Sequence, residues 1–169
     1  ILSHDQPKKD RKNLNKLDQY FKKYGNKIEY WMDFKNLSEI NCDEAIKAVK
    51  SIVDQLGINQ DNLYFAPFIT DIDKAKIVYQ TIRKYFSKEA KILAVIEQLS
   101  LDSYLSYHQK LMDNNIFGLS IQFHNINLEF MKIFSDIEIF AWTVNKRKDA
   151  IYLEKIGVQN IVTDKILWN

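Results

Sequence analysis

The sequence is poor in the residues that mark several classes of protein. Cys42 is its single cysteine, which excludes an internal disulfide and leaves the redox compartment undecided. The four glycines form no G-x-G-x-x-G run, which argues against a dinucleotide site. No apolar run approaches the roughly 20 residues of a transmembrane segment. A net charge of only +2, without a long basic run, argues against nucleic acid as a partner.

What remains is the composition of an ordinary globular protein. With 169 residues, 46% hydrophobic and 27% charged, the chain can bury a sizeable core, and we expect residues 1–169 to form a single domain. The sequence begins at Ile1 without an initiating methionine, so any targeting segment would precede it and the localisation is unknown.

Short apolar segments alternate with amphipathic ones along the whole chain. The apolar segments predict strands at 28–34, 63–68, 91–97, 116–123, 137–144 and 158–163. Helical spacing predicts helices at 14–24, 43–56, 71–86, 101–113, 127–134 and 147–156. Asp43 is expected to cap the second helix and Gly57 to end it. Strands that alternate with helices pair in parallel, so the predicted fold class is α/β.

An open doubly wound sheet and a closed (β/α)8 TIM-type barrel both fit this alternation. Polar residues collect at the ends of several strands, and contributions from many strands to one rim favour the barrel. These residues are Asp33, Lys35, Glu97, Gln122, His124, Trp142, Asn145 and Asp164.

Asp33 and Lys35 stand two residues apart at the end of the first predicted strand. On an extended chain both side chains therefore leave the same face. At the mouth of a barrel, an acid and a base so placed can hold a divalent metal and the phosphate that the metal bridges. The alternative is an exposed ion pair at a strand end.

Three stretches of sequence form distinctive motifs. The first is Ser-His-Asp at 3–5, and the second is Trp-Met-Asp-Phe-Lys at 31–35. The third and most specific runs from Phe-Ala-Trp-Thr-Val-Asn at 140–145 through Gly-Val at 157–158 to Ile-Val-Thr-Asp at 161–164. Together they resemble the glycerophosphodiester phosphodiesterase family, within the phosphatidylinositol-phospholipase-C-like phosphodiesterases, with Asp33 in place of the family's usual Glu. The resemblance implies a TIM-type barrel and hydrolysis of glycerophosphodiesters to an alcohol and glycerol 3-phosphate.

The resemblance also implies roles for individual residues. His4 would be the acid/base catalyst, Lys35 would contact the phosphate, and Asp33 would be one carboxylate of a site for Ca²⁺ or Mg²⁺. Trp142 would line the substrate mouth. The alternatives are a surface position for His4, a solvated Lys35 and a core position for Trp142.

Three further strand-end residues are weaker candidates for substrate contacts. Glu97, Gln122 and His124 could face the same cavity, or each could cap the helix that follows it.

The family's H-R, E-N and E-x-D motifs, carried by its first two strands, have no match here. We therefore expect about six of the eight βα units. The first two strands are either supplied by another chain or segment, cut away, or lost. Without the E-x-D carboxylates, metal binding by this chain is expected to be weak or absent, and the chain alone to be inactive. The alternatives are a noncatalytic relic or binding subunit on the same scaffold, and a related phosphodiesterase that cleaves phospholipids.

Overall fold

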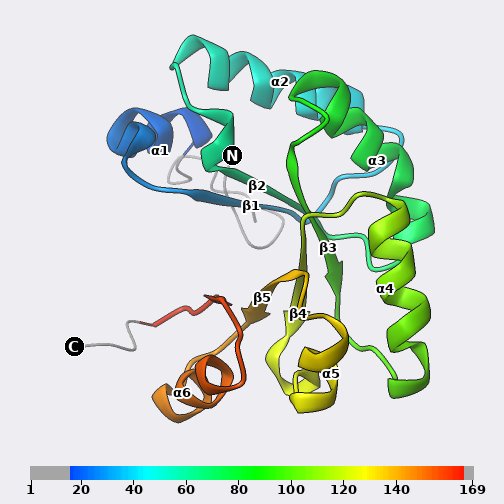
Figure 1. Cartoon of the computed structure of the whole chain (residues 1–169). Helices are drawn as coiled ribbons and strands as arrows, with labels where there is room; N and C mark the ends of the chain where they lie inside the picture. The colour runs from blue at the N-terminus through cyan, green and yellow to red at the C-terminus, as the bar shows by residue number, and fades with distance from the viewer. Residues whose placement is uncertain (1–15, 166–169) are drawn as a thin grey trace, which may run out of the picture.

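A computed structural model describes residues 16–165, and these form one six-stranded parallel sheet flanked by helices (Figure 1). The strands are β1 (Tyr30–Phe34), β2 (Leu63–Pro67), β3 (Lys91–Ile96), β4 (Gly118–Gln122), β5 (Glu138–Trp142) and β6 (Asn160–Ile161). The helices are α1 (Leu17–Tyr24), α2 (Cys42–Gln55), α3 (Ile72–Tyr85), α4 (Tyr104–Asp113), α5 (Leu128–Ile133) and α6 (Arg147–Lys155). Within 16–165, no helix has the length and apolar character needed to cross a membrane.

The order of the strands decides between the two architectures that the sequence left open. Neighbours in the sheet follow the sequence order from β1 to β6, and every pair is parallel. A doubly wound sheet would reverse its order at a switch point. The sheet curls into an arc with the helices on its outer side (Figure 1). The predicted α/β barrel type is therefore confirmed, with six strands in the described part.

The two faces of the arc carry separate hydrophobic clusters. On the outer face, side chains such as Leu119 and Ile121 pack with those of the helices in one large core. On the inner face, a smaller cluster contains Ala66, Leu93, Val95 and Phe140, with Trp31, Tyr64, Phe68, Trp142 and Val162 packed against it. Both faces are thus covered, which explains why the strands are mostly apolar at every position.

The prediction that Asp43 caps the second helix is wrong. The N-cap of α2 is Asn41, and Asp43 lies in the first turn, where a negative charge favours the helix N-terminus. The Asp43 carboxylate accepts hydrogen bonds from Lys84 Nζ at 2.7 Å and Tyr85 Oη at 2.9 Å, which tie α2 to α3. The Lys84 ammonium holds the pKa of Asp43 below its ordinary value. Gly57 follows the helix with a φ of +62°, as a glycine after a helix end commonly does.

The amino end of the arc is filled by a group of side chains that we call the amino-rim cluster: Glu29, Tyr64, Lys91 and Phe117. Lys91 Nζ donates hydrogen bonds to the carbonyl oxygen of Asp61 at 2.7 Å and to Tyr64 Oη at 3.3 Å. Tyr64 Oη in turn donates to Glu29 Oε1 at 3.1 Å. Lys91 Nζ also lies 4.5 Å from the centre of the Tyr64 ring and 5.6 Å from that of Phe117. The polar groups at this end of the arc therefore bind one another.

Candidate functional site

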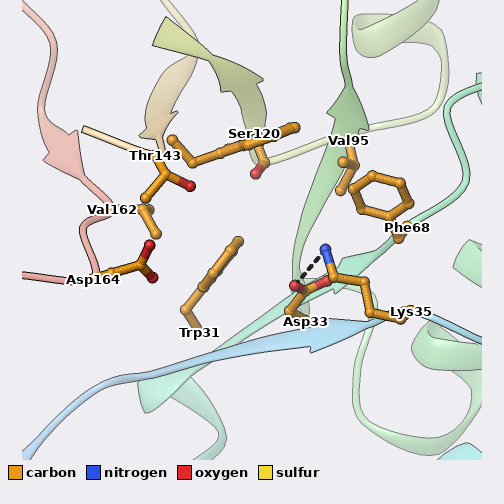
Figure 2. A pocket seen from close by; sticks show the side chains of 10 residues that line it. Trp31, Asp33, Lys35, Phe68, Val95, Ser120, Thr143, Val162 and Asp164 are labelled. Atoms are coloured by element: carbon orange, nitrogen blue, oxygen red, sulfur yellow. Dashed lines mark ion pairs between the residues drawn. The ribbon is translucent and has the colours of Figure 1, made fainter. Parts of the chain in front are cut away.

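The carboxyl ends of the strands surround a cavity of about 140 Å³. Each of the six strands, or the residues directly after it, contributes to the wall (Figure 2). The lining residues are Trp31, Asp33, Lys35, Phe68, Val95, Ser120, Trp142, Thr143, Val162 and Asp164. The cavity therefore lies at the end of the arc where barrel enzymes carry their active sites.

Asp33 and Lys35 form an ion pair in the wall of this cavity. Lys35 Nζ lies 2.8 Å from Asp33 Oδ2, and the two side chains are 28% and 22% exposed (Figure 2). The ammonium also sits 4.0 Å from the centre of the Phe68 ring, a cation–π distance. Asp33 is the fourth residue of β1 and Lys35 follows the strand, so the extended backbone sends both side chains to the inner face. A half-buried cation held in this way can meet an anion that enters the cavity.

Within residues 16–165, several polar atoms around the ion pair have no hydrogen-bond partner. They are Asp33 Oδ1, Ser120 Oγ and the Nε1 atoms of Trp31 and Trp142, all buried. These four atoms belong to residues that line the cavity. Buried polar groups in proteins are usually paired, so unpaired ones gathered at a cavity indicate a place where a bound molecule completes the hydrogen bonds.

Asp164 stands on the opposite side of the cavity from Asp33 (Figure 2). Its backbone N–H donates to Asn145 Oδ1 at 3.0 Å, and Asn145 Nδ2 donates to Asp164 Oδ2 at 3.4 Å. Thr163 Oγ1 also donates to Asn145 Oδ1 at 3.0 Å. Asn145 thus fixes the segment after β6 against the segment after β5 and positions an exposed carboxylate at the rim.

The structure brings three of the predicted site residues together and separates three others. Asp33, Lys35 and Trp142 line the cavity. Glu97 is exposed after β3, where its carbonyl oxygen accepts from Asn125 Nδ2 at 2.8 Å.

Gln122 and His124 are likewise absent from the cavity wall. Gln122 is half-buried at the end of β4, and His124 is exposed with its ring centre 3.8 Å from that of Phe123. His4 lies outside the described residues. The chemical roles assigned to all these residues stay predictions.

Trp31, Phe68 and Ser120 line the cavity but were not predicted from the sequence. A signal existed for Trp31, because a residue two positions before Asp33 on the same strand faces the same side. Ser120 is a polar residue inside the strand Gly-Leu-Ser-Ile-Gln, two positions before a strand-end Gln122. Phe68 carried no signal beyond its place directly after β2, because a single aromatic residue there is equally typical of the core.

The described residues do not by themselves fit a divalent metal. Within 16–165 there is no group of three or more His, Cys, Asp or Glu residues that could hold an ion. One oxygen of Asp33 is bound by the Lys35 ammonium, whose charge opposes a cation at that carboxylate. A metal at Asp33 would need further ligands from outside residues 16–165.

Sequence comparisons give no match for this chain. No family model matches it, and no curated protein matches it.

Solved structures do match the fold. A glycerophosphodiester phosphodiesterase of Thermotoga maritima aligns with a TM-score of 0.63 and 19% identity, over 89% of this chain and 60% of that one. A phosphodiesterase of Oleispira antarctica, solved with its product sn-glycerol-3-phosphate, aligns with a TM-score of 0.60 and 18% identity, over 75% of this chain and 47% of that one.

Barrels of other function match as well. A dipeptide epimerase of Enterococcus faecalis aligns with a TM-score of 0.53 and 17% identity, over 83% of this chain and 39% of that one. Identities this low show a shared fold and not a shared activity. The chain spans about half the length of the phosphodiesterases that it matches. The resemblance expected from the sequence is thus confirmed for the fold: this chain has the α/β-barrel architecture of the glycerophosphodiester phosphodiesterases.

Proposed function

We propose that this chain is the phosphate-binding part of a phosphodiesterase that hydrolyses small glycerophosphodiesters to an alcohol and glycerol 3-phosphate. The observation that carries the proposal is the Asp33–Lys35 pair, set in a cavity at the carboxyl end of a parallel arc. The fold shared with phosphodiesterases supports it.

Lys35 is the residue of this chain that would bind the phosphoryl group. Its ammonium can donate to the phosphoryl oxygens and stabilise the negative charge that grows on them in the transition state. Trp142 would form the wall next to Phe68, their ring centres 6.3 Å apart, so that two adjoining aromatic side chains border the ligand. His4 would transfer the proton to or from the leaving oxygen, because imidazole titrates near neutral pH.

The dependence on Ca²⁺ or Mg²⁺ belongs to the same proposal. Asp33 would supply one carboxylate, and the remaining ligands would come from a segment or chain that also supplies the first two strands of the barrel. In this view residues 1–169 are the latter part of a single barrel domain and are inactive alone.

A second candidate is a noncatalytic module that binds phosphate esters on the same scaffold. One observation favours it: both histidines in the described part lie away from the cavity. His108 is on α4, where its Nε2 lies 2.8 Å from Asp136 Oδ1. His124 lies in the 3₁₀ turn after β4, outside the wall of the cavity.

The deciding experiment uses the full-length protein and measures release of sn-glycerol 3-phosphate from sn-glycero-3-phosphocholine, with and without a chelator. We expect release that the chelator abolishes. Phosphatidylinositol vesicles, offered as the alternative substrate, should be cleaved poorly. Binding of sn-glycerol 3-phosphate without any hydrolysis would favour the noncatalytic module. Absence of both binding and hydrolysis would refute the proposal.

A further inference from the structure

Ser120 occupies an unusual position in this molecule. It is the middle residue of β4, has 0% of its surface exposed, and lines the cavity. Counting tyrosine as hydrophobic, it is the one polar or charged residue within 16–165 that is fully buried. Its Oγ has no hydrogen-bond partner in the described part of the chain.

The surroundings of Ser120 offer its hydroxyl nothing to bind within the sheet. In the register of the parallel strands, Ser120 is level with Val95 on β3 and Phe140 on β5. Both neighbours belong to the apolar cluster on the inner face of the arc. A buried hydroxyl without a partner has lost its hydrogen bonds to water and gained none in return. The unpaired hydroxyl therefore destabilises the folded state unless a ligand in the cavity binds it.

Two other donors border the same cavity. The indole N–H groups of Trp31 and Trp142 are buried and, like Ser120 Oγ, have no partner among the described residues. In Figure 2 the Trp31 ring rises from β1 into the space between the Asp33–Lys35 pair and Asp164. The cavity therefore combines charged groups, the Lys35 ammonium and the carboxylates of Asp33 and Asp164, with neutral hydrogen-bonding groups. Lys35 can bind the anionic part of a ligand, and the neutral groups can bind its hydroxyls.

The cavity is large enough for the polyol part of such a ligand. An engineered cavity of about 150 Å³ in another protein holds benzene, which has six non-hydrogen atoms. Glycerol also has six, and the cavity here measures about 140 Å³. A glycerol-sized group therefore fits this space.

From these observations we infer that Ser120 is a specificity-determining residue that binds a hydroxyl group of the ligand's polyol part while Lys35 binds its phosphate. This inference rests on the proposed function and deepens it. It names the ligand class as a small phosphorylated polyol, and it assigns the recognition of the polyol to Ser120, assisted by the Trp31 indole N–H.

The test compares two ligands in the full-length protein by titration calorimetry: sn-glycerol 3-phosphate and n-propyl phosphate, which has the same carbon chain without the hydroxyls. The wild type should prefer sn-glycerol 3-phosphate by roughly tenfold to a hundredfold, since buried polar groups would be left unpaired by the propyl ester. Ser120→Ala should remove most of this preference and leave the affinity for n-propyl phosphate nearly unchanged. Ser120→Thr, which keeps a hydroxyl, should retain part of it, and Trp31→Phe should reduce it moderately.

The outcomes separate this inference from the proposed function. If Ser120→Ala weakens both ligands equally, or if the wild type does not discriminate between them, the inference is wrong while phosphate binding stands. If neither ligand binds the wild type, the proposed function is wrong, and the inference that rests on it is wrong as well. Unfolding in urea supplies an independent readout: Ser120→Ala should leave the midpoint unchanged or raise it, because it removes an unpaired polar group. A lowered midpoint together with an unchanged ligand preference would assign Ser120 a structural role and overturn the inference.

Discussion

The two ends of the arc look alike in their charges and differ in how completely their polar groups are paired. Lys35 at the carboxyl end and Lys91 at the amino end are 28% and 24% exposed. Each lies near a carboxylate and over an aromatic ring, at 4.0 Å from the centre of Phe68 and 4.5 Å from that of Tyr64. By burial and charge alone, either lysine could be taken for the functional one.

The difference lies in what surrounds each lysine. Lys91 also donates to a backbone carbonyl and to the Tyr64 hydroxyl, and that hydroxyl donates to Glu29. Lys35 borders a cavity in which four buried polar atoms have no partner within the described chain. A saturated cluster stabilises a fold, whereas an unsaturated one is prepared for a ligand. Unmet hydrogen-bonding capacity, more than charge, thus distinguishes the carboxyl end from the amino end.

The largest expected effect comes from replacing Lys35, with the same replacement of Lys91 as the comparison. Lys35→Met removes the ammonium and keeps the length of the side chain, and should weaken binding of sn-glycerol 3-phosphate by about two orders of magnitude, since a charge-assisted hydrogen bond is lost. Lys91→Met is the matched control and should leave the affinity nearly unchanged. Titration calorimetry measures both, with circular dichroism to check folding. Equal losses in the two variants would remove the distinction between the two ends.

Asp33→Asn should change anion binding in the opposite direction. The Asp33 carboxylate neutralises Lys35 and repels an incoming phosphate, so its removal should tighten binding of inorganic phosphate by about threefold to tenfold at low salt. The same variant should be inactive in hydrolysis if Asp33 is a metal ligand. Asp164→Asn, at the exposed far side of the cavity, should produce a smaller gain. Weaker phosphate binding by Asp33→Asn would mean that Asp33 mainly orients the lysine.

Tyr64→Phe tests the hydrogen bonds of the amino-rim cluster. Burial raises the pKa of Tyr64, so the hydroxyl stays protonated at neutral pH and can donate to Glu29 while it accepts from Lys91. Its loss should lower the free energy of unfolding by about 1 kcal/mol, measured by urea denaturation, without affecting phosphate affinity. A loss of affinity without a loss of stability would contradict the structural assignment of the amino-rim cluster.

The smallest effect comes from an ion pair that touches neither end. Lys110 Nζ lies 2.6 Å and Lys76 Nζ 2.8 Å from the carboxylate of Asp73 on the outer helices. Hydrogen bonds from Lys110 and then Lys76 lower the pKa of Asp73 from 3.8 to about 2. The stability that this carboxylate contributes is therefore present above pH 4 and is lost as the pH falls towards 2.

The Asp73→Asn variant checks this contribution and serves as the reference for an exposed pair. It should lower the urea midpoint slightly at pH 7 and progressively less as the pH falls from 4 to below 2. A shift at pH 7 as large as that of Tyr64→Phe would show that exposed ion pairs contribute as much stability as the hydrogen bonds of the amino-rim cluster.

Much of the fold could be predicted from the sequence because the positions of strands and helices follow from local patterns of apolar and polar residues. The strand expected at 28–34 is found at Tyr30–Phe34, and the one expected at 91–97 at Lys91–Ile96. The last strand is shorter than expected, Asn160–Ile161 rather than 158–163. Its pairing continues through single backbone bonds, such as Val144 N to Val162 O at 2.9 Å, that do not extend the regular strand.

The site could be predicted only where its residues are close in sequence. The spacing of two residues placed Asp33 and Lys35 on one face, since an extended chain alternates its side chains. Glu97 and His124 also follow strands, yet the chain turns after β3 and β4 and leaves both exposed. Ser120 was not recognised because its neighbours Leu119 and Ile121 are as deeply buried as the residues of the inner face. The sequence of β4 does not say which face curls inward.

The sequence by itself determined the alternation of strands and helices and the shared face of Asp33 and Lys35, because these depend on backbone geometry over a few residues. Only the tertiary structure decided that the sheet curls, that Lys35 borders a cavity while Lys91 is saturated, and that the Ser120 hydroxyl faces that cavity. The physical reason is that curvature and pairing depend on contacts between strands far apart in the chain, which no local pattern records.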